Sequence, residues 1–272
     1  MKSFTIALAT AKEAIRQPAF FVLAAMAGFW LVASVFVAYF TFGEDIKMYK
    51  DTGLTTISFV CLLLALLTAS STVAEEIEGK TAITLLSKPI NRRQFIVGKF
   101  LGIEIGVLAM FLLLGTIFAL GVAYKFSYDL RESASVDSGN RQLGQVLQVL
   151  PGLALGFFEV TTLTAISVAI STRVPMLVNL VVCISIFFLG HLSPVLVEIT
   201  SGGTTNELVK FMSHLFEFLL PSLEFYNAGP SISTGSVIPW VGYVLPAFGY
   251  CVLYSGAAIL FAFLLFEDRD LA

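Results

Sequence analysis

The sequence predicts an all-α, polytopic membrane protein with six transmembrane helices, and two observations carry this prediction. Of the 272 residues, 57% are hydrophobic and only 13% are charged, which is more apolar surface than one water-soluble core can bury. Six apolar stretches also reach the roughly 20 residues that a helix needs to cross a hydrocarbon core of about 30 Å. Their ranges are 19–42, 53–74, 105–124, 149–172, 174–197 and 241–266.

Each stretch is expected to be a helix, because the backbone inside a bilayer has to satisfy its own hydrogen bonds. The alternation of polar and apolar residues that marks a membrane barrel is absent from the sequence. Five stretches contain no Asp, Glu, Lys or Arg, and the fourth contains one, Glu159. We therefore treat residues 1–272 as a single transmembrane domain.

The distribution of basic residues predicts the orientation. Ten of the 16 Lys and Arg residues lie on the same side as the N-terminus when six spans are threaded through the bilayer. The positive-inside rule then places the N-terminus in the cytoplasm, and the even number of spans returns the C-terminus to the same side. The net charge of −3, without a basic stripe, argues against a nucleic-acid partner.

Two segments outside the spans have amphipathic patterns. Residues 1–17 predict a cytoplasmic interfacial helix, with Phe4 and Leu8 on one face and Lys12 and Arg16 on the other. Residues 198–240 form an external segment in this topology. Its apolar residues between 208 and 219 recur at helical spacing, which predicts a second helix lying on the surface.

Four polar residues in or near the spans are candidates for function. Glu159 lies inside the fourth span, where an ionised carboxylate costs a few kcal/mol unless it is paired or hydrated. It is either a functional ionisable group or a carboxyl that a Thr or Asn179 holds by hydrogen bonds. Glu104 is expected to reach the membrane interface or a Lys or Arg. His191 is either a hydrogen-bonded packing residue or a proton relay.

The segment between the second and third spans, residues 75–93, is more patterned than a simple link. Acidic residues open it, an apolar set with Leu85 and Leu86 follows, and Pro89 closes it before Arg92 and Arg93. This order suits a short amphipathic cytoplasmic helix with acidic residues at its start, as the helix dipole prefers. The alternative is a loop that only anchors the two spans.

The same residues resemble a known family. The run Glu76-Ile-Glu-Gly-Lys-Thr, then Leu85-Leu-Ser-Lys-Pro-Ile-Asn-Arg, then Gly98-Lys-Phe-Leu-Gly is similar to the signature loop of the permease subunits of type-2 ABC transporters. Six spans and a cytoplasmic N-terminal helix extend the resemblance over the whole chain. One departure is Lys80, which separates Gly79 from Thr81 where many relatives have Gly directly before Thr.

The resemblance implies that the loop forms a coupling helix that docks on a separate ABC ATP-binding subunit. It also implies a second permease subunit, identical or related, a plasma membrane of the bacterial or archaeal type, and export as the direction of transport. ATP and Mg would be held by the partner subunit. The residues implied in ATPase coupling are Glu75, Glu76, Glu78, Gly79, Lys80, Thr81, Leu85, Leu86, Ser87, Lys88, Pro89, Arg92 and Arg93.

The sequence predicts no catalytic residue, metal site or cofactor in this chain. A phosphate-binding loop ending in Gly79-Lys80-Thr81 would need Gly at position 74, which is Ala. His191 and His214 lack the His-Glu-x-x-His spacing of a metalloprotease. Two other functions stay open. One is a secondary transporter or channel in which Glu159 and His191 carry ions, and the other is a membrane anchor for an ATPase that acts mechanically on other proteins.

Overall fold

The computed structural model describes residues 2–36, 45–74, 91–132, 139–201 and 207–267. The predicted coupling residues from Glu75 to Pro89 lie outside the described residues, and Arg92 and Arg93 lie within them. The described elements are α1 (Lys2–Arg16), α2 (Pro18–Phe36), α3 (Asp45–Ala69), η1 (Ser70–Ala74), α6 (Arg92–Glu132), α7 (Gly139–Leu147), α8 (Leu150–Ser171), α9 (Met176–Ser201), α10 (Glu207–Leu219), η2 (Leu223–Tyr226), α11 (Gly229–Ser233), η3 (Trp240–Val244) and α12 (Leu245–Glu267).

The predicted fold class is confirmed, since six helices of the described chain are long and apolar enough to cross a membrane. They cover 18–36, 45–72, 92–128, 142–171, 176–200 and 240–266. Three spans begin well before their predicted starts, at 45, 92 and 142 rather than 53, 105 and 149. In the added turns of two of them, polar side chains have partners. Lys50 in α3 donates to Gln148 at 3.1 Å, and Lys99 in α6 lies 3.8 Å from Glu13 of α1.

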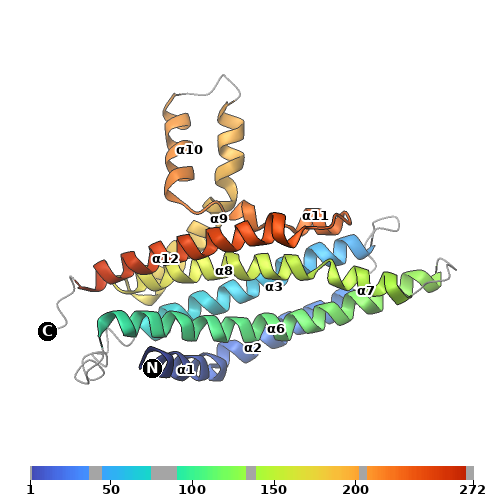
Figure 1. Ribbon diagram of the computed structural model, residues 1–272, viewed down its shortest axis with the longest axis horizontal. Helices are drawn as coiled ribbons and strands as arrows, with labels where there is room; N and C mark the ends of the chain where they lie inside the picture. The colour runs from blue at the N-terminus through green and yellow to red at the C-terminus, as the bar shows by residue number, and fades with distance from the viewer. Residues whose placement is uncertain (1, 37–44, 75–90, 133–138, 202–206, 268–272) are drawn as a thin grey trace.

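Four elements meet at one end of the bundle, which we call the terminal end. They are α1, η1, the start of α6 and the last turn of α12 (Figure 1). The N-terminal helix and the end of the last span therefore lie on the same side, as the even number of spans predicts. The gap from 75 to 90 is flanked by η1 and α6, so both of its described neighbours belong to this end.

Helix α1 lies along the first turns of α6 (Figure 1). Glycines on α6 permit this close approach, because a Cβ added at Gly102 would meet the side chain of Thr10 and the carbonyl of Ala7. The face of α1 that packs on α6 carries small residues, whereas Phe4 and Leu8 point outward and are exposed. The predicted helix is confirmed, and its outward apolar residues suit contact with lipid.

Helix α8 is the most enclosed span and packs against α3, α6, α9 and α12. Two of its side chains contact neighbouring helices: Glu159 lies near His191 of α9, and Thr161 donates to Glu104 of α6. Polar groups that face the interior of the bundle are therefore concentrated on α8.

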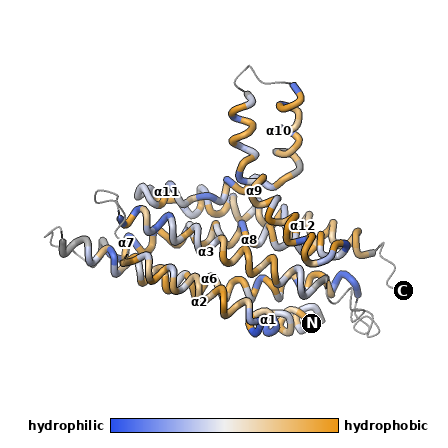
Figure 2. Tube along the Cα trace, turned by 180° about the vertical axis from the view of Figure 1, so that it is seen from behind, coloured by the Kyte–Doolittle hydropathy of each residue, from blue (hydrophilic) through white to orange (hydrophobic). Residues whose placement is uncertain are grey.

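Helices α9 and α10 form an antiparallel pair whose outer part stands away from the other helices (Figure 1). Pro194 lies inside α9, where its ring removes a backbone donor and favours a bend. The hydroxyls of Thr200 and Ser213 hydrogen bond at 3.1 Å across the pair. The predicted helix is present as α10, but it packs on the end of α9. Much of the pair is hydrophobic (Figure 2), and Phe211 and Phe218 are exposed.

Candidate functional site

The terminal end holds a π-helical turn, η1, directly before residues 75–90. Helix α3 ends at Ala69, and the next five residues, Ser70–Ala74, form this wider turn. Single π-helical turns occur frequently at functional sites, because they change the direction of side chains within a helix. η1 is the described segment that joins the end of α3 to residue 75.

Asn179 of α9 ties η1 to two spans. Its side-chain amide donates to Ser70 Oγ at 2.9 Å and to Ser167 Oγ of α8 at 3.0 Å. The residue is fully buried, with 0% of its surface exposed. The sequence suggested Asn179 as a partner for Glu159, whereas the structure places it between η1, α8 and α9. Three spans are thus joined at the turn that leads into the loop.

Gln17, at the junction of α1 and α2, contacts the same end of α3. Its amide nitrogen lies 3.4 Å from Ser71 Oγ, and its carbonyl oxygen accepts from Thr68 Oγ1 at 3.4 Å. Since α1 also packs along α6, the N-terminal helix touches the described segments on both sides of 75–90. The N-terminal segment therefore contacts both the end of α3 and the first turns of α6.

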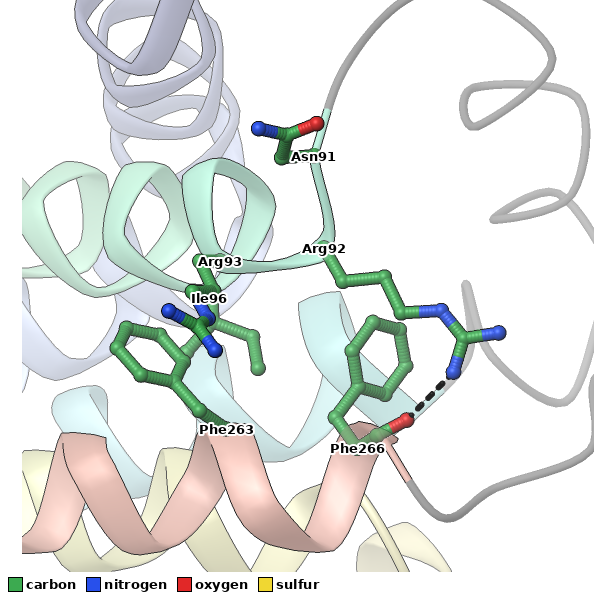
Figure 3. Close-up of a pocket in the computed structure, with 6 residues that line it drawn as sticks. All are labelled: Asn91, Arg92, Arg93, Ile96, Phe263 and Phe266. Atoms are coloured by element: carbon green, nitrogen blue, oxygen red, sulfur yellow. Dashed lines mark hydrogen bonds between the residues drawn. The ribbon is translucent and has the colours of Figure 1, made fainter.

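Two arginines from different segments bind the last turn of α12. Arg92 Nη1 donates to the carbonyl of Phe266 at 2.9 Å (Figure 3), and Arg173 Nε donates to the carbonyl of Leu265 at 2.8 Å. The final carbonyls of a helix lack partners within the helix, and cations there also interact favourably with the helix dipole. The α12 end is therefore fixed to the start of α6 and to the α8–α9 link.

Aromatic contacts complete this connection. The rings of Phe95 and Phe266 stack with centroids 6.0 Å apart, and the Arg92 guanidinium lies 5.6 Å from the Phe266 centroid. Arg93 extends beside Phe263, and a cavity of about 350 Å³ opens between these side chains (Figure 3). Of the predicted coupling residues, Arg92 and Arg93 thus lie where α6 meets α12.

Glu104 differs from its prediction. It is buried within the bundle, with 9% of its surface exposed. Its Oε2 accepts a hydrogen bond from Thr161 Oγ1 of α8 at 2.9 Å, whereas Lys99 lies 3.8 Å from Glu13. The prediction failed because a neutral hydroxyl on the adjacent helix was a nearer partner than a basic residue one and a half turns away. Glu104 joins α6 to α8.

Glu159 and His191 are brought together across α8 and α9. Glu159 Oε1 lies 3.5 Å from His191 Nε2, and His191 Nδ1 lies 3.2 Å from the carbonyl oxygen of Phe187. The Thr residues of α8 near Glu159 bond elsewhere, as Thr162 does with Tyr226 at 3.2 Å. Both residues line a cavity of about 430 Å³, which we call the midspan cavity. Its lining residues on α8 are Gly152, Gly156 and Glu159, which lie in the first half of that helix and so away from the terminal end.

Six apolar helices held together by buried polar side chains define this chain as a polytopic α-helical membrane protein. Residues 75–90 are flanked by η1 and α6, whose polar side chains contact other helices at the terminal end. These contacts distinguish the chain from a bundle of apolar helices alone. The family model described as ABC-2 family transporter protein matches residues 30–271. The chain belongs to this family and is a membrane-spanning permease subunit of an ABC transporter. Among curated proteins, no match was found.

Sequence reasoning missed several residues of the terminal end, chiefly Ser70, Ser167 and Arg173. Serines inside spans usually bond their own backbone, so nothing in the local sequence distinguishes Ser70 from its neighbours. Arg173 carried a signal, because it is the one charged residue between the fourth and fifth spans. An arginine in so short a link between two spans can reach few acceptors. The free carbonyls at the end of a neighbouring helix are among them, and Arg173 binds one at Leu265.

Proposed function

We propose that this chain couples ATP hydrolysis by a separate ATP-binding subunit to the export of a substrate across the plasma membrane. The terminal end faces the cytoplasm, where ten of the 16 basic residues fall when the spans are threaded from a cytoplasmic N-terminus. Residues 75–90 dock on the ATP-binding subunit, which holds ATP and Mg. Two permease chains, identical or related, enclose the path and contact the surrounding lipid.

The contact between Asn179 and Ser70 is the single observation that best supports this coupling. A movement of the loop would shift η1, and Asn179 would pass the shift to α8 and α9 because it is hydrogen bonded to both Ser70 and Ser167. Buried polar contacts of this kind have few alternative partners inside a membrane bundle, so they move as a unit or break.

A second connection supports the same proposal from the other side of the loop. Arg92 follows the loop and donates to the carbonyl of Phe266 at 2.9 Å. A pull on the start of α6 would therefore act on the end of α12, which also contacts Arg173. Residues 75–90 are preceded by α3 and η1 and followed by α6, whose Arg92 contacts α12. A movement of the ATP-binding subunit could therefore reach the spans from both ends of this segment.

The direct test is a pair of substitutions in the loop. Replacing Leu85 and Leu86 with Asp should abolish co-purification of the ATP-binding subunit, because carboxylates cannot bury in an apolar docking surface. A matched control replaces Leu143 and Leu147 of α7, two exposed leucines at the far end of the bundle (Figure 1). The control should bind the subunit normally. Membrane yield and thermal melting report whether both variants insert and fold.

The proposal fails if the Leu85→Asp, Leu86→Asp variant retains the ATP-binding subunit at the wild-type ratio. It also fails if the α7 control loses the subunit to the same extent, because the effect would then reflect general damage. Loss in the loop variant alone supports docking through residues 75–90.

The contact between Glu159 and His191 favours a second candidate function, a transporter that works without an ATPase. A carboxylate and an imidazole 3.5 Å apart inside the membrane could carry protons or ions. Liposomes that hold the purified chain alone decide between the two. Ion flux without any ATP-binding subunit supports the second candidate, and flux that requires the subunit and ATP supports the first. A complex that hydrolyses ATP without any flux identifies a mechanical anchor.

A further inference from the structure

The midspan cavity lies against the one carboxylate in the middle of α8. Its walls come from α3, α8, α9 and residues 226–229. Its volume of about 430 Å³ falls in the range of small-molecule sites, about 300–1,000 Å³. Five apolar side chains, three of them phenylalanines, line it together with six polar side chains and three glycines. The cavity therefore offers a ligand both apolar contact and polar partners.

The carboxylate of Glu159 lacks a hydrogen-bond donor. Only 7% of the residue's surface is exposed, and Oε1 is buried without a hydrogen-bond partner among the described residues. The nearest basic atom is His191 Nε2 at 3.5 Å. A buried carboxylate oxygen that faces a cavity without a donor costs free energy until a cation or a proton reaches it.

His191 in its neutral form cannot supply that donor. Its Nδ1 lies 3.2 Å from the carbonyl oxygen of Phe187, which can only accept, so Nδ1 carries the hydrogen. In a neutral imidazole Nε2 then presents a lone pair to the carboxylate of Glu159. The two residues attract each other only when they share one additional proton. A cation in the cavity would take the place of that proton.

The charged groups around the cavity favour a positively charged ligand. Among the described residues, His191 is the one basic side chain that lines it. Asp51 lies beside Gly229 at its rim, and Glu224 is in the same turn of chain as Tyr226. Burial raises the pKa of the Tyr226 hydroxyl, so this group adds hydrogen-bonding capacity and no charge at neutral pH.

The aromatic side chains indicate that the ligand also has an apolar part. Phe59 of α3 and Phe187 of α9 approach with ring centroids 6.3 Å apart, and Phe187 and Phe188 lie 5.4 Å apart. Faces of aromatic rings attract ammonium groups, and their edges pack against hydrocarbon. A bare metal ion would need several oxygen ligands, whereas groups of three or more His, Cys, Asp or Glu that could hold one are absent from the described residues.

We propose that the midspan cavity binds an organic cation, with the Glu159 carboxylate pairing with its ammonium group and the phenylalanine rings packing on its apolar part. The inference rests on the proposed function, since it names the substrate class of the permease. The ammonium group could belong to a soluble amine or to a lipid headgroup, and the test separates these two sources.

The test uses the full-length chain in nanodiscs of phosphatidylglycerol, a lipid without an ammonium group. Binding of phenyltrimethylammonium is compared with binding of tert-butylbenzene, its neutral isostere. The wild type should bind the cation at least tenfold more tightly, and Glu159→Gln should remove this preference. The matched control is Glu104→Gln, which neutralises another buried carboxylate that does not line the cavity and should retain the preference.

Two further variants keep the proposal testable if Glu159→Gln fails to fold. Glu159→Asp retains the charge and should retain a preference for the cation. His191→Leu removes the competing imidazole and should bind the cation more tightly than the wild type. Equal binding of the cation by wild type and Glu159→Gln, or weaker binding by His191→Leu, would overturn the proposal.

Adding phosphatidylcholine to the nanodiscs identifies the source of the ammonium group. Competition with the probe assigns the site to a lipid headgroup, and its absence assigns the site to a soluble amine. Co-purification of the ATP-binding subunit is measured on the same preparations. A chain that retains the subunit but shows no cation preference refutes this inference alone, and a chain that prefers the cation but binds no subunit refutes the proposed coupling alone.

Discussion

The side-chain amide of Asn179 donates to Ser70 Oγ at 2.9 Å, which joins α9 to the π-helical turn that precedes residues 75–90. Replacing Asn179 with Leu should lower the free energy of unfolding by about 1–2 kcal/mol, because two buried interhelical hydrogen bonds are lost. The larger effect should be on coupling: ATP hydrolysis by the complex should continue while transport per ATP falls several-fold. Unfolding in denaturing detergent and paired hydrolysis and flux assays measure the two effects.

A matched control for this substitution is Ser185→Ala on the same helix. Ser185 is exposed and donates to the carbonyl of Val181 within α9, so its loss should change neither stability nor coupling. Transport per ATP that stays at the wild-type value in Asn179→Leu would contradict a role for this contact in coupling.

The packing of α1 on α6 should depend on Gly102. A Cβ at this position would meet the side chain of Thr10 and the backbone carbonyl of Ala7, and the carbonyl has little freedom to yield. Overpacking of this kind typically costs about 1–3 kcal/mol. Gly102→Ala should therefore lower the Tm of the purified chain and expose the Lys12–Glu13 bond to protease.

Gly249 provides the same substitution at an open position, since no described atom lies within 4 Å of a Cβ built there. Gly249→Ala should leave the Tm unchanged or raise it, because Ala is the better helix former. If both alanine variants melt alike and resist protease alike, α1 is not held against α6 at Gly102.

The end of α12 should loosen when its two arginine contacts are removed. Arg92→Met and Arg173→Met keep an apolar stem but lose the hydrogen bonds to Phe266 and Leu265. Each bond should contribute about 1 kcal/mol, so amide hydrogen exchange in the last turn should accelerate roughly fivefold per substitution. Amides in the middle of α8 serve as the internal reference. Unchanged exchange at 263–266 in the double variant would show that the arginines do not hold this turn.

The predicted orientation can be tested by cysteine labelling, because the native residues Cys61, Cys183 and Cys251 are buried. Ser3→Cys at the terminal end should react with a membrane-impermeant maleimide only after the cells are permeabilised. Val237→Cys, whose native side chain is 77% exposed, should react in intact cells. The opposite pattern would place the terminal end outside the cytoplasm and would rule out docking of a cytosolic ATPase there.

The sequence predicted the number and nature of the spans well, because long apolar stretches leave a chain few alternatives to transmembrane helices. It could not predict where α3 and α6 begin. Lys50 and Lys99 lie inside these helices, where they contact Gln148 and Glu13, residues distant in sequence. The pairing of α10 with the end of α9 is likewise a tertiary contact, which a local pattern does not contain.

The polar residues of the spans were identified as candidates, but their partners were not. Glu104 was expected to reach the membrane interface or a basic residue, and its partner in the structure is Thr161. Asn179 contacts Ser70 and Ser167 rather than Glu159. Helical periodicity gives the face on which a side chain lies, whereas its partner depends on the rotation of the neighbouring helix. The choice between partners of similar chemistry therefore requires the packed bundle.

The central claim is that this permease works with a separate ATP-binding subunit, and purification from native membranes tests it most directly. The full chain, isolated in mild detergent, should bring with it a chain that carries a phosphate-binding loop and hydrolyses ATP, identified by mass spectrometry. An isolated chain that transports its substrate in liposomes with no ATP-binding chain present would contradict the claim.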